Sequence, residues 1–236
     1  MSAAQKTNAA PVKGQKIIVA IDGPAGAGKS TIARYLADRF GLLNLETGAM
    51  YRAFALKTLR MGLPLDDAAV LTRVAEETSI TLEPVAEGNR VLLDGEDVTG
   101  LVRNQMVTDA ASKVSVLSPI RAWMVRLQQQ LGAHGGVVME GRDIGTVVFP
   151  QAEVKIFVDA SADVRGMRRF EQLGKNPAQK AEEVIRDLRA RDDRDRNRAD
   201  SPLKAADDAI LLDSTALTLE QTLQEAARIV DEYLVR

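Results

Sequence analysis

Residues 23–30 read GPAGAGKS, a segment in which closely spaced glycines precede a lysine and a serine. Glycine lets a backbone curl so tightly that successive N–H groups point at one anion. Lys29 would supply an exposed, mobile charge for the outer phosphates of ATP, and the Ser30 hydroxyl would be a ligand for Mg²⁺. The motif predicts a nucleoside triphosphate site formed by Gly23, Pro24, Ala25, Gly26, Ala27, Gly28, Lys29, Ser30 and Thr31.

The sequence on either side of this loop supports the same interpretation. Residues 16–21, KIIVAI, predict a buried strand, and residues 30–40 predict a helix that stops at Gly41. A helix that begins at the loop directs the positive end of its dipole at a bound phosphate. A glycine-rich turn that merely joins a strand to a helix is the alternative, and the complete motif in this context disfavours it.

The overall composition limits what else the chain can do. Of its 236 residues, 45% are hydrophobic and 27% are charged, and the net charge of −2 favours neither a nucleic-acid nor a membrane partner. The absence of cysteine and the single histidine exclude disulfides, thiolate nucleophiles and His/Cys metal sites, but not Mg²⁺. Residues 1–15 are polar and no run of about 18 apolar residues occurs, so we expect a cytoplasmic protein with a flexible tail at residues 1–15.

Further apolar runs resemble the first and predict an α/β fold with a five-stranded parallel sheet. They span residues 42–45, 136–139, 154–158 and 209–212. Residues 80–83 and 90–94 flank AEGN and predict an inserted antiparallel hairpin. Other expected helices span residues 66–78, 105–117, 118–131 and 219–235. Ser118 is expected to be an N-cap with Pro119 at the first helical position, and Thr218 to form a capping box with Gln221.

Several polar segments carry arginines that suit a second phosphate. Arg52 lies on a helix that follows the strand at 42–45, and its planar guanidinium matches phosphate oxygens in a bidentate way. Glu140 ends the strand at 136–139, where an acid could support Mg²⁺. Residues 191–198 place one set of side chains on a single helix face, namely Arg191, Arg194, Asp195 and Arg198, while Asp192, Asp193 and Arg196 point elsewhere. The alternatives are a surface position for Arg52, a strand-end salt bridge for Arg142 and Asp143, and a solvated face for the helix at 191–198.

Five segments, in the same order, resemble the bacterial cytidylate kinases, a branch of the nucleoside monophosphate (NMP) kinases. They are ETGAMYR (46–52), GRDIGTVVFP (141–150), VKIFVDAS (154–161), RDDRDRNR (191–198) and LLDST (211–215). The resemblance extends from residue 16 to the C-terminus. Glu46 stands where the family usually has Asp, and Ser30 where some members have Gly. The N-K-x-D motif expected of a GTPase is not present in the sequence.

The resemblance implies a P-loop three-layer fold with an inserted NMP-binding domain, which contains a small antiparallel sheet, and a short helical lid. The implied division is a core at 16–50, 135–169 and 201–236, an NMP-binding insertion at 51–134, and a lid at 170–200.

The same resemblance implies roles for residues around a bound CMP. Arg142 would contact the acceptor phosphate, together with Arg52, whose guanidinium suits a phosphate independently of the resemblance. The pentose contacts would come from Ser112, Arg191 and Asp195. The base would be surrounded by Thr47, Arg121, Asp143 and Arg198, with the two arginines holding Asp143 ionised. The candidate catalytic residues are Lys29, Arg142 and Arg194. Because Arg191 and Asp195 lie one helical turn apart, we also expect an ion pair between them.

The implied reaction is ATP + CMP giving ADP + CDP, with dCMP also accepted, catalysed by a monomer that binds only small molecules. The attacking phosphate oxygen is already anionic near pH 7, so a strong general base is unnecessary. Lys29, Mg²⁺ and converging arginines would offset the repulsion between two polyanions, and lid closure would exclude water. Two alternatives stay open: a P-loop kinase that acts on UMP, AMP or a non-nucleotide, and a nucleotide-binding switch or motor that recognises a protein.

Overall fold

The structure is a computed structural model that describes residues 16–85, 88–172 and 180–235. Its main sheet has five parallel strands in the order β2-β6-β1-β7-β8. They are β1 (Ile18–Asp22), β2 (Leu43–Glu46), β6 (Val137–Glu140), β7 (Val154–Asp159) and β8 (Ile210–Asp213). These are the strands that the apolar runs predict, so the expected α/β fold with a parallel sheet is confirmed.

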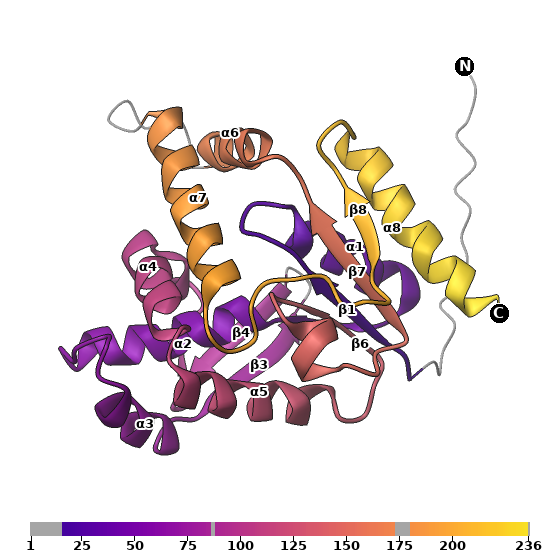
Figure 1. The fold of residues 1–236 in the computed structure, drawn as a ribbon. Coiled ribbons are helices and arrows are strands. Elements are labelled where there is room, and N and C mark those ends of the chain that lie inside the picture. The colour runs from indigo at the N-terminus through magenta and orange to yellow at the C-terminus, as the bar shows by residue number, and fades with distance from the viewer. Residues whose placement is uncertain (1–15, 86–87, 173–179, 236) are drawn as a thin grey trace.

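Helices cover both faces of this sheet and give three layers (Figure 1). The helices of one layer are α1 (Lys29–Phe40) and α8 (Leu219–Leu234), and those of the other include α2 (Thr47–Arg60) and α5 (Ser118–Gly132). Because side chains alternate along a strand, Val19 and Ile21 of β1 pack in the α1/α8 layer, while Ala20 between them packs in the α2/α5 layer. The central strand that leads into the P-loop is therefore held from both sides.

A second, antiparallel sheet lies beside β2, between α2 and α5 in the sequence. Its strands are β3 (Ile80–Val85), β4 (Gly88–Leu93) and β5 (Glu96–Asp97), and α3 (Ala68–Glu76), η1 (Leu101–Arg103) and α4 (Gln105–Val114) accompany them. Asn89 joins the two sheets, because its side chain donates to the Asn44 carbonyl over 2.8 Å and accepts from the Glu46 N–H over 3.0 Å. One carboxamide thus takes the place of a neighbouring strand at the free edge of β2. The expected hairpin is confirmed.

Three further elements lie near the carboxyl ends of the central strands. They are the π-helical turn η2 (Ile144–Val148), α6 (Ala162–Gln172) and α7 (Ala181–Asn197). Figure 1 shows α7 extending from α6 towards α4, and the Arg194 Nε of α7 donates to the Ser112 Oγ of α4 over 3.3 Å. Parallel sheets bind ligands at the carboxyl ends of their strands, so these elements frame the expected site.

Some helix boundaries differ from the predicted ones. Ser118 is the first residue of α5 and not its N-cap. The N-cap position is taken by Leu117, which has an extended backbone and no side-chain group that could cap the helix. The helix expected to reach residue 117 ends at Val114, and α1 begins at Lys29. The Thr218 capping box is confirmed. The tail expected at residues 1–15 lies outside the described residues, as do residues 173–179 of the expected lid.

Candidate active site

The P-loop, residues 23–30, connects β1 to α1 through a close approach to β7. Gly23 has a φ of +147°, and a Cβ at this position would lie only 2.0 Å from the Val158 carbonyl oxygen. A side chain is therefore excluded here, as the motif predicts. Lys29 is 6% exposed, and its Nζ donates to the Pro24 carbonyl over 2.7 Å. The expectation of an exposed lysine is wrong, because the loop closes around the side chain.

Burial perturbs the charge of this lysine. The pKa of Lys29 falls to about 7, first because burial removes the ammonium from water and then because Arg142 repels it. Glu140 and Asp22 offset the effect of burial only in part, and phosphate oxygens placed beside Lys29 would add to this counter-charge. The P-loop is thus arranged for an anionic ligand.

Ser30 and Glu140 lie together at the start of α1. The Ser30 Oγ donates to the Glu140 Oε1 over 2.5 Å, and burial followed by the nearby Glu46 raises the pKa of Glu140. Hydroxyl and carboxylate oxygens are ligands that suit Mg²⁺. The described ranges contain no group of three or more His, Cys, Asp or Glu side chains with metal-binding geometry. A Mg²⁺ ion here would therefore take further ligands from substrate phosphates and water.

Arg142 and Arg191 bring further positive charge close to Lys29, and Arg52 lies near both of these arginines. Burial, followed by the charge of Arg142, lowers the pKa of Arg191 to about 10, and burial lowers the pKa of Arg52. The Nε atoms of Arg52 and Arg191 are buried and have no hydrogen-bond partner in the described part of the chain. An oxyanion placed among these groups would stabilise their charged forms. We call Lys29, Arg52, Arg142 and Arg191 the cation cluster.

Asp143 is flanked by two arginines, as predicted. It forms an ion pair with Arg121, and the Arg198 Nη2 lies 3.8 Å from its Oδ1, with all three side chains almost fully buried. The guanidinium of Arg121 lies 5.8 Å from the ring centre of Tyr51, whose buried hydroxyl has no partner among the described residues. Thr47 donates to the Glu140 carbonyl over 2.7 Å. We call Asp143, Arg121, Arg198 and Tyr51 the Asp143 cluster, in which the Tyr51 hydroxyl keeps hydrogen-bonding capacity.

The α7 helix brings Asp195 to the cation cluster. Asp195 accepts from the Arg142 Nε over 2.9 Å and lies 4.0 Å from Arg198. The expected ion pair between Arg191 and Asp195 is not found among the described residues, because Arg142 reaches Asp195 from the loop after β6. Arg194 is exposed, and its contact with Ser112 closes the gap between α7 and α4. The structure thus brings together the predicted residues of the lid and the insertion.

The sequence profile of the cytidylate kinase family matches residues 19–232, which include the P-loop, the cation cluster and the Asp143 cluster. The chain belongs to the cytidylate kinase family. The cytidylate kinase of Pasteurella multocida is 42% identical over 93% of this chain and 97% of its own length. That of Geobacter sp. strain M21 is 45% identical over 95% of this chain and 97% of its own length. That of Solibacter usitatus is 46% identical over 94% of this chain and 95% of its own length. The resemblance found in the five motifs is therefore confirmed.

Sequence patterns missed the role of Asp22 in this member of the cytidylate kinase family. Its carboxylate accepts from the N–H groups of Ile144 and Gly145, over 2.8 and 2.7 Å. These bonds fix the first turn of η2, directly after Asp143. Burial raises the pKa of Asp22 to about 6. An acid as the last residue of an otherwise apolar strand was the only available signal.

Asp192 was assigned no role by the helical projection, which places it away from Arg191. It does lie on another face of α7, but it is buried and its Oδ2 is 2.6 Å from the Arg165 Nη1 on α6. The projection says only that Asp192 points away from the ligand face, and it does not show that α6 covers that side of α7. Only the packing of α6 on α7 shows the partner.

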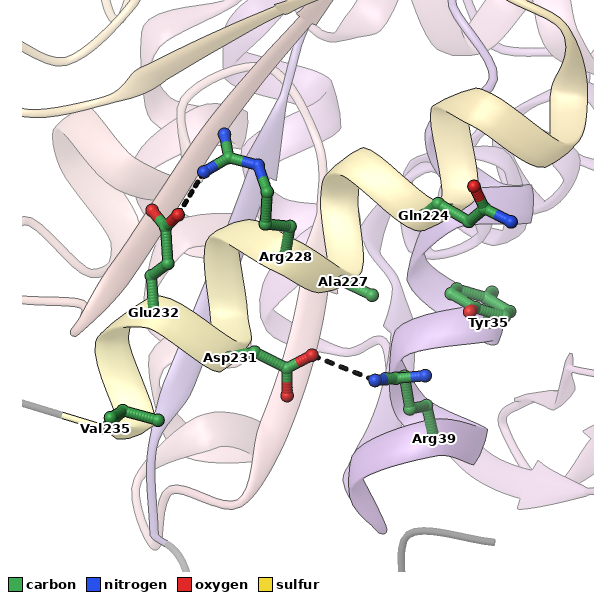
Figure 2. A pocket seen from close by; sticks show the side chains of 8 residues that line it. All are labelled: Tyr35, Arg39, Gln224, Ala227, Arg228, Asp231, Glu232 and Val235. Atoms are coloured by element: carbon green, nitrogen blue, oxygen red, sulfur yellow. Dashed lines mark hydrogen bonds and ion pairs between the residues drawn. The ribbon is translucent and has the colours of Figure 1, made fainter. Parts of the chain in front are cut away.

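A surface groove of about 470 Å³ lies between α1 and α8 (Figure 2). Its charged groups are paired with each other, Arg39 with Asp231 and Arg228 with Glu232. Its α1 residues come from the second half of that helix, so Arg39 lies about 15 Å along the axis from Lys29. The groove offers phosphate no unpaired cation and is separate from the candidate active site of this cytidylate kinase family member.

No helix within the described ranges has both the length and the apolar character needed to cross a membrane.

Proposed function

We propose that this chain transfers the γ-phosphoryl group of ATP to CMP, giving ADP and CDP, and that it accepts dCMP as well. Family membership supports a nucleotide kinase, and the curated relatives are named cytidylate kinases. One observation carries the proposal: the cation cluster extends from Lys29 of the P-loop to Arg142, next to Asp143, and burial lowers the pKa of its members Lys29, Arg52 and Arg191. Two phosphate-bearing substrates that meet there would neutralise it.

The donor site is the P-loop with the residue after it. The backbone of residues 23–31 binds the phosphates of ATP, and Lys29 exchanges its bond to the Pro24 carbonyl for phosphate oxygens. Ser30, held by Glu140, is the protein ligand that would bind Mg²⁺. When bound, Mg²⁺ neutralises charge on the phosphates.

The acceptor site lies on the other side of the cation cluster. Arg52 and Arg142 bind the phosphate of CMP. The pentose contacts come from Ser112, Arg191 and Asp195, and the base contacts from Thr47, Arg121, Asp143 and Arg198. This assignment is supported by the ion pairs of Asp143 with Arg121 and of Asp195 with Arg142, which hold the two carboxylates in place.

The transfer forms a bond between a CMP phosphate oxygen and the γ-phosphorus while the bond from that phosphorus to ADP breaks. The attacking oxygen carries no proton that must be removed, so the work is positioning and charge stabilisation. Lys29, Arg142 and Arg194 act on the transferring group. Arg194 is exposed, which suits a residue that moves onto the group when both substrates are bound.

We extend the proposal to the organisation of the chain. The core (16–50, 135–169 and 201–236) holds the parallel sheet, the NMP-binding insertion (51–134) holds the antiparallel sheet, and the lid (170–200) holds α7. The protein would act as a cytoplasmic monomer in pyrimidine nucleotide metabolism. Light scattering after size-exclusion chromatography, with and without both nucleotides, tests the oligomeric state.

Product identification tests the reaction and the acceptor together. ATP is incubated with CMP, dCMP, UMP or AMP, and the nucleotide products are separated by chromatography. We expect diphosphates from CMP and dCMP, little from UMP and none from AMP. Efficient phosphorylation of UMP or AMP alone would replace the proposed acceptor, and failure of every monophosphate to stimulate ADP release would refute the proposed reaction.

A further inference from the structure

A buried ion pair joins α6 to α7 outside the residues assigned to either nucleotide. The side chains of Arg165 and Asp192 are 4% and 8% exposed, and their Nη1 and Oδ2 atoms lie 2.6 Å apart. The helices approach closely here, because a Cβ on Gly166 would lie 2.2 Å from the Ile185 Cγ1. Moving α7 relative to α6 would therefore disturb the pair.

Arg165 also contacts the P-loop. Its Nη1 donates to the Ala25 carbonyl over 2.9 Å, and its Nε donates to the Ala160 carbonyl, just after β7, over 2.8 Å. In a planar trans peptide the C=O and the next N–H point in opposite directions. Fixing the Ala25 carbonyl therefore fixes the direction of the Gly26 N–H, one of the donors with which a P-loop binds phosphate.

Asp192, the partner of Arg165, lies on the turn of α7 that also carries Arg191. Arg191, which precedes it, belongs to the cation cluster. Successive helical residues are about 100° apart, so one turn of α7 presents Arg191 to the acceptor side and Asp192 to α6. The same helix packs on the P-loop through Val184 and Leu188, which contact Ala25. The turn that carries Arg191 is thus linked to both substrate sites.

Joining two helices does not by itself account for this pair. Apolar residues of similar size would join them at least as well, since burial removes both charges from water. The Asp192 Oδ1 is buried without a partner among the described residues, so the pair is not optimised for stability. An exposed pair, Arg189 with Asp163, already links α7 and α6 across 2.8 Å. The buried pair adds a fixed connection between the Ala25 carbonyl and Arg191.

We propose that Arg165 and Asp192 are positioning residues that couple the ATP site to the acceptor site. ATP fixes the P-loop, the Ala25 carbonyl fixes Arg165, and Arg165 through Asp192 fixes the turn that places Arg191 on the acceptor phosphate. By linkage, the acceptor favours the ATP-binding form of the loop to the same degree. The inference rests on the proposed function, because it takes the P-loop as the donor site and Arg191 as an acceptor contact.

Calorimetric titration measures this coupling directly. The Kd of the acceptor monophosphate is determined with and without a saturating non-hydrolysable ATP analogue with Mg²⁺, and the wild type should bind about fivefold or more tightly with it. Asp192→Asn keeps the shape and removes the charge. The double variant Arg165→Met with Asp192→Leu replaces the pair by apolar groups. Both should reduce the tightening to less than about twofold. Asp192→Asn, which leaves Arg165 bonded to the Ala25 carbonyl, should also keep the Kd of each ligand alone within about threefold. Arg189→Ala, the matched control on the same two helices, should keep the wild-type coupling.

Coupling that persists in both variants, or that is absent from the wild type, would overturn the proposal. A lower Tm with coupling retained would also overturn it, since the pair would then only stabilise the fold. The acceptor used is the one that product identification selects. Rejection of CMP would therefore refute the proposed acceptor while the coupling is still measured, and the two failures stay distinguishable.

Discussion

Arg228 on α8 and Arg191 on α7 carry the same guanidinium group in opposite surroundings. Arg228 is half exposed and forms ion pairs with Glu225 and Glu232, which lie one helical turn to either side, and these hydrogen bonds raise its pKa. Figure 2 shows the pair with Glu232. Arg191 is largely buried near other cations, its Nε has no partner among the described residues, and burial lowers its pKa to about 10. The Arg228 guanidinium is bonded to carboxylates of its own helix, whereas Arg191 forms no ion pair among the described residues and the nearby Asp195 offsets the effect of burial only in part.

The difference separates a charged surface from a binding site. A solvated ion pair gains little from its partner, because water screens the attraction. A buried cation without a counter-charge destabilises the folded protein, and an anionic ligand removes that cost when it binds. The number of arginines in a region therefore says less about phosphate binding than their burial and the guanidinium nitrogens left without a hydrogen-bond partner.

The largest effect should come from Lys29→Ala, which removes the cation in the P-loop. We expect kcat to fall by about three orders of magnitude or more, because the lysine stabilises charge on the transferring phosphoryl group. Steady-state kinetics with ATP and CMP measure the loss, and circular dichroism establishes that the variant is folded. Near-normal turnover in a folded variant would remove Lys29 from the mechanism.

Lys29→Ala should preserve or raise stability while it lowers activity, because the substitution removes an unfavourable buried charge. The pKa of Lys29 is about 7 in the fold and 10.5 ordinarily, so its charge destabilises the nucleotide-free protein fully below pH 7 and progressively less as the pH rises towards 10.5. Lys29→Ala should therefore have an equal or higher Tm than the wild type at pH 6, and the advantage should shrink by pH 9. A variant that is less stable than wild type at pH 6, with a deficit that shrinks as the pH rises, would contradict this sign.

A smaller effect is expected from Asp143→Asn, which changes the carboxylate that lies between Arg121 and Arg198. An ionised carboxylate accepts from the exocyclic amine of cytosine but repels the O4 oxygen of uracil, whereas an asparagine amide can turn to donate to O4. We expect kcat/KM for CMP to fall and the CMP-to-UMP ratio of kcat/KM to narrow by about tenfold or more, which corresponds to about 1.4 kcal/mol.

The control for this variant is the fold itself, because Asp143 is the buried partner of Arg121. Circular dichroism and an unchanged Kd for the ATP analogue would show that the fold and the ATP site are retained. A CMP-to-UMP ratio equal to that of the wild type would mean that Asp143 supports the η2 turn and that another residue recognises the base.

The fold was largely predictable because its signals are local. Each strand of the parallel sheet is a short apolar run bounded by turn residues, and the P-loop is a contiguous motif whose geometry follows from glycine and a helix N-terminus. The predicted Ser118 N-cap was wrong, because the local pattern favours serine at a cap, whereas the helix in the structure begins at Ser118 and places Leu117 at the cap.

The side-chain partners were less predictable because they come from distant segments. Asp195 pairs with Arg142 and not with Arg191, although only Arg191 is its helical neighbour. Asp192 binds Arg165 on another helix. Periodicity shows which residues share a face, but it does not show which other element covers that face. The motifs placed the substrate residues, and the structure was needed for the contacts that hold them.

The smallest effect should come from Arg228→Ala, which tests the solvated member of the comparison. Both of its ion pairs are exposed and lie within one helix, so water and salt already screen them. We expect kcat and the KM values for both nucleotides to stay within about twofold of wild type, and the Tm to shift by no more than about 2 °C. The shift should be smaller in 0.5 M NaCl than in 0.05 M, because salt weakens the pairs that the substitution removes, at a Debye length of roughly 4 against 14 Å. Kinetics and thermal melts at the two salt concentrations measure both quantities. A loss of activity comparable to that of Lys29→Ala, in a folded protein, would mean that the α1/α8 face takes part in nucleotide binding and that exposure does not distinguish the two kinds of arginine.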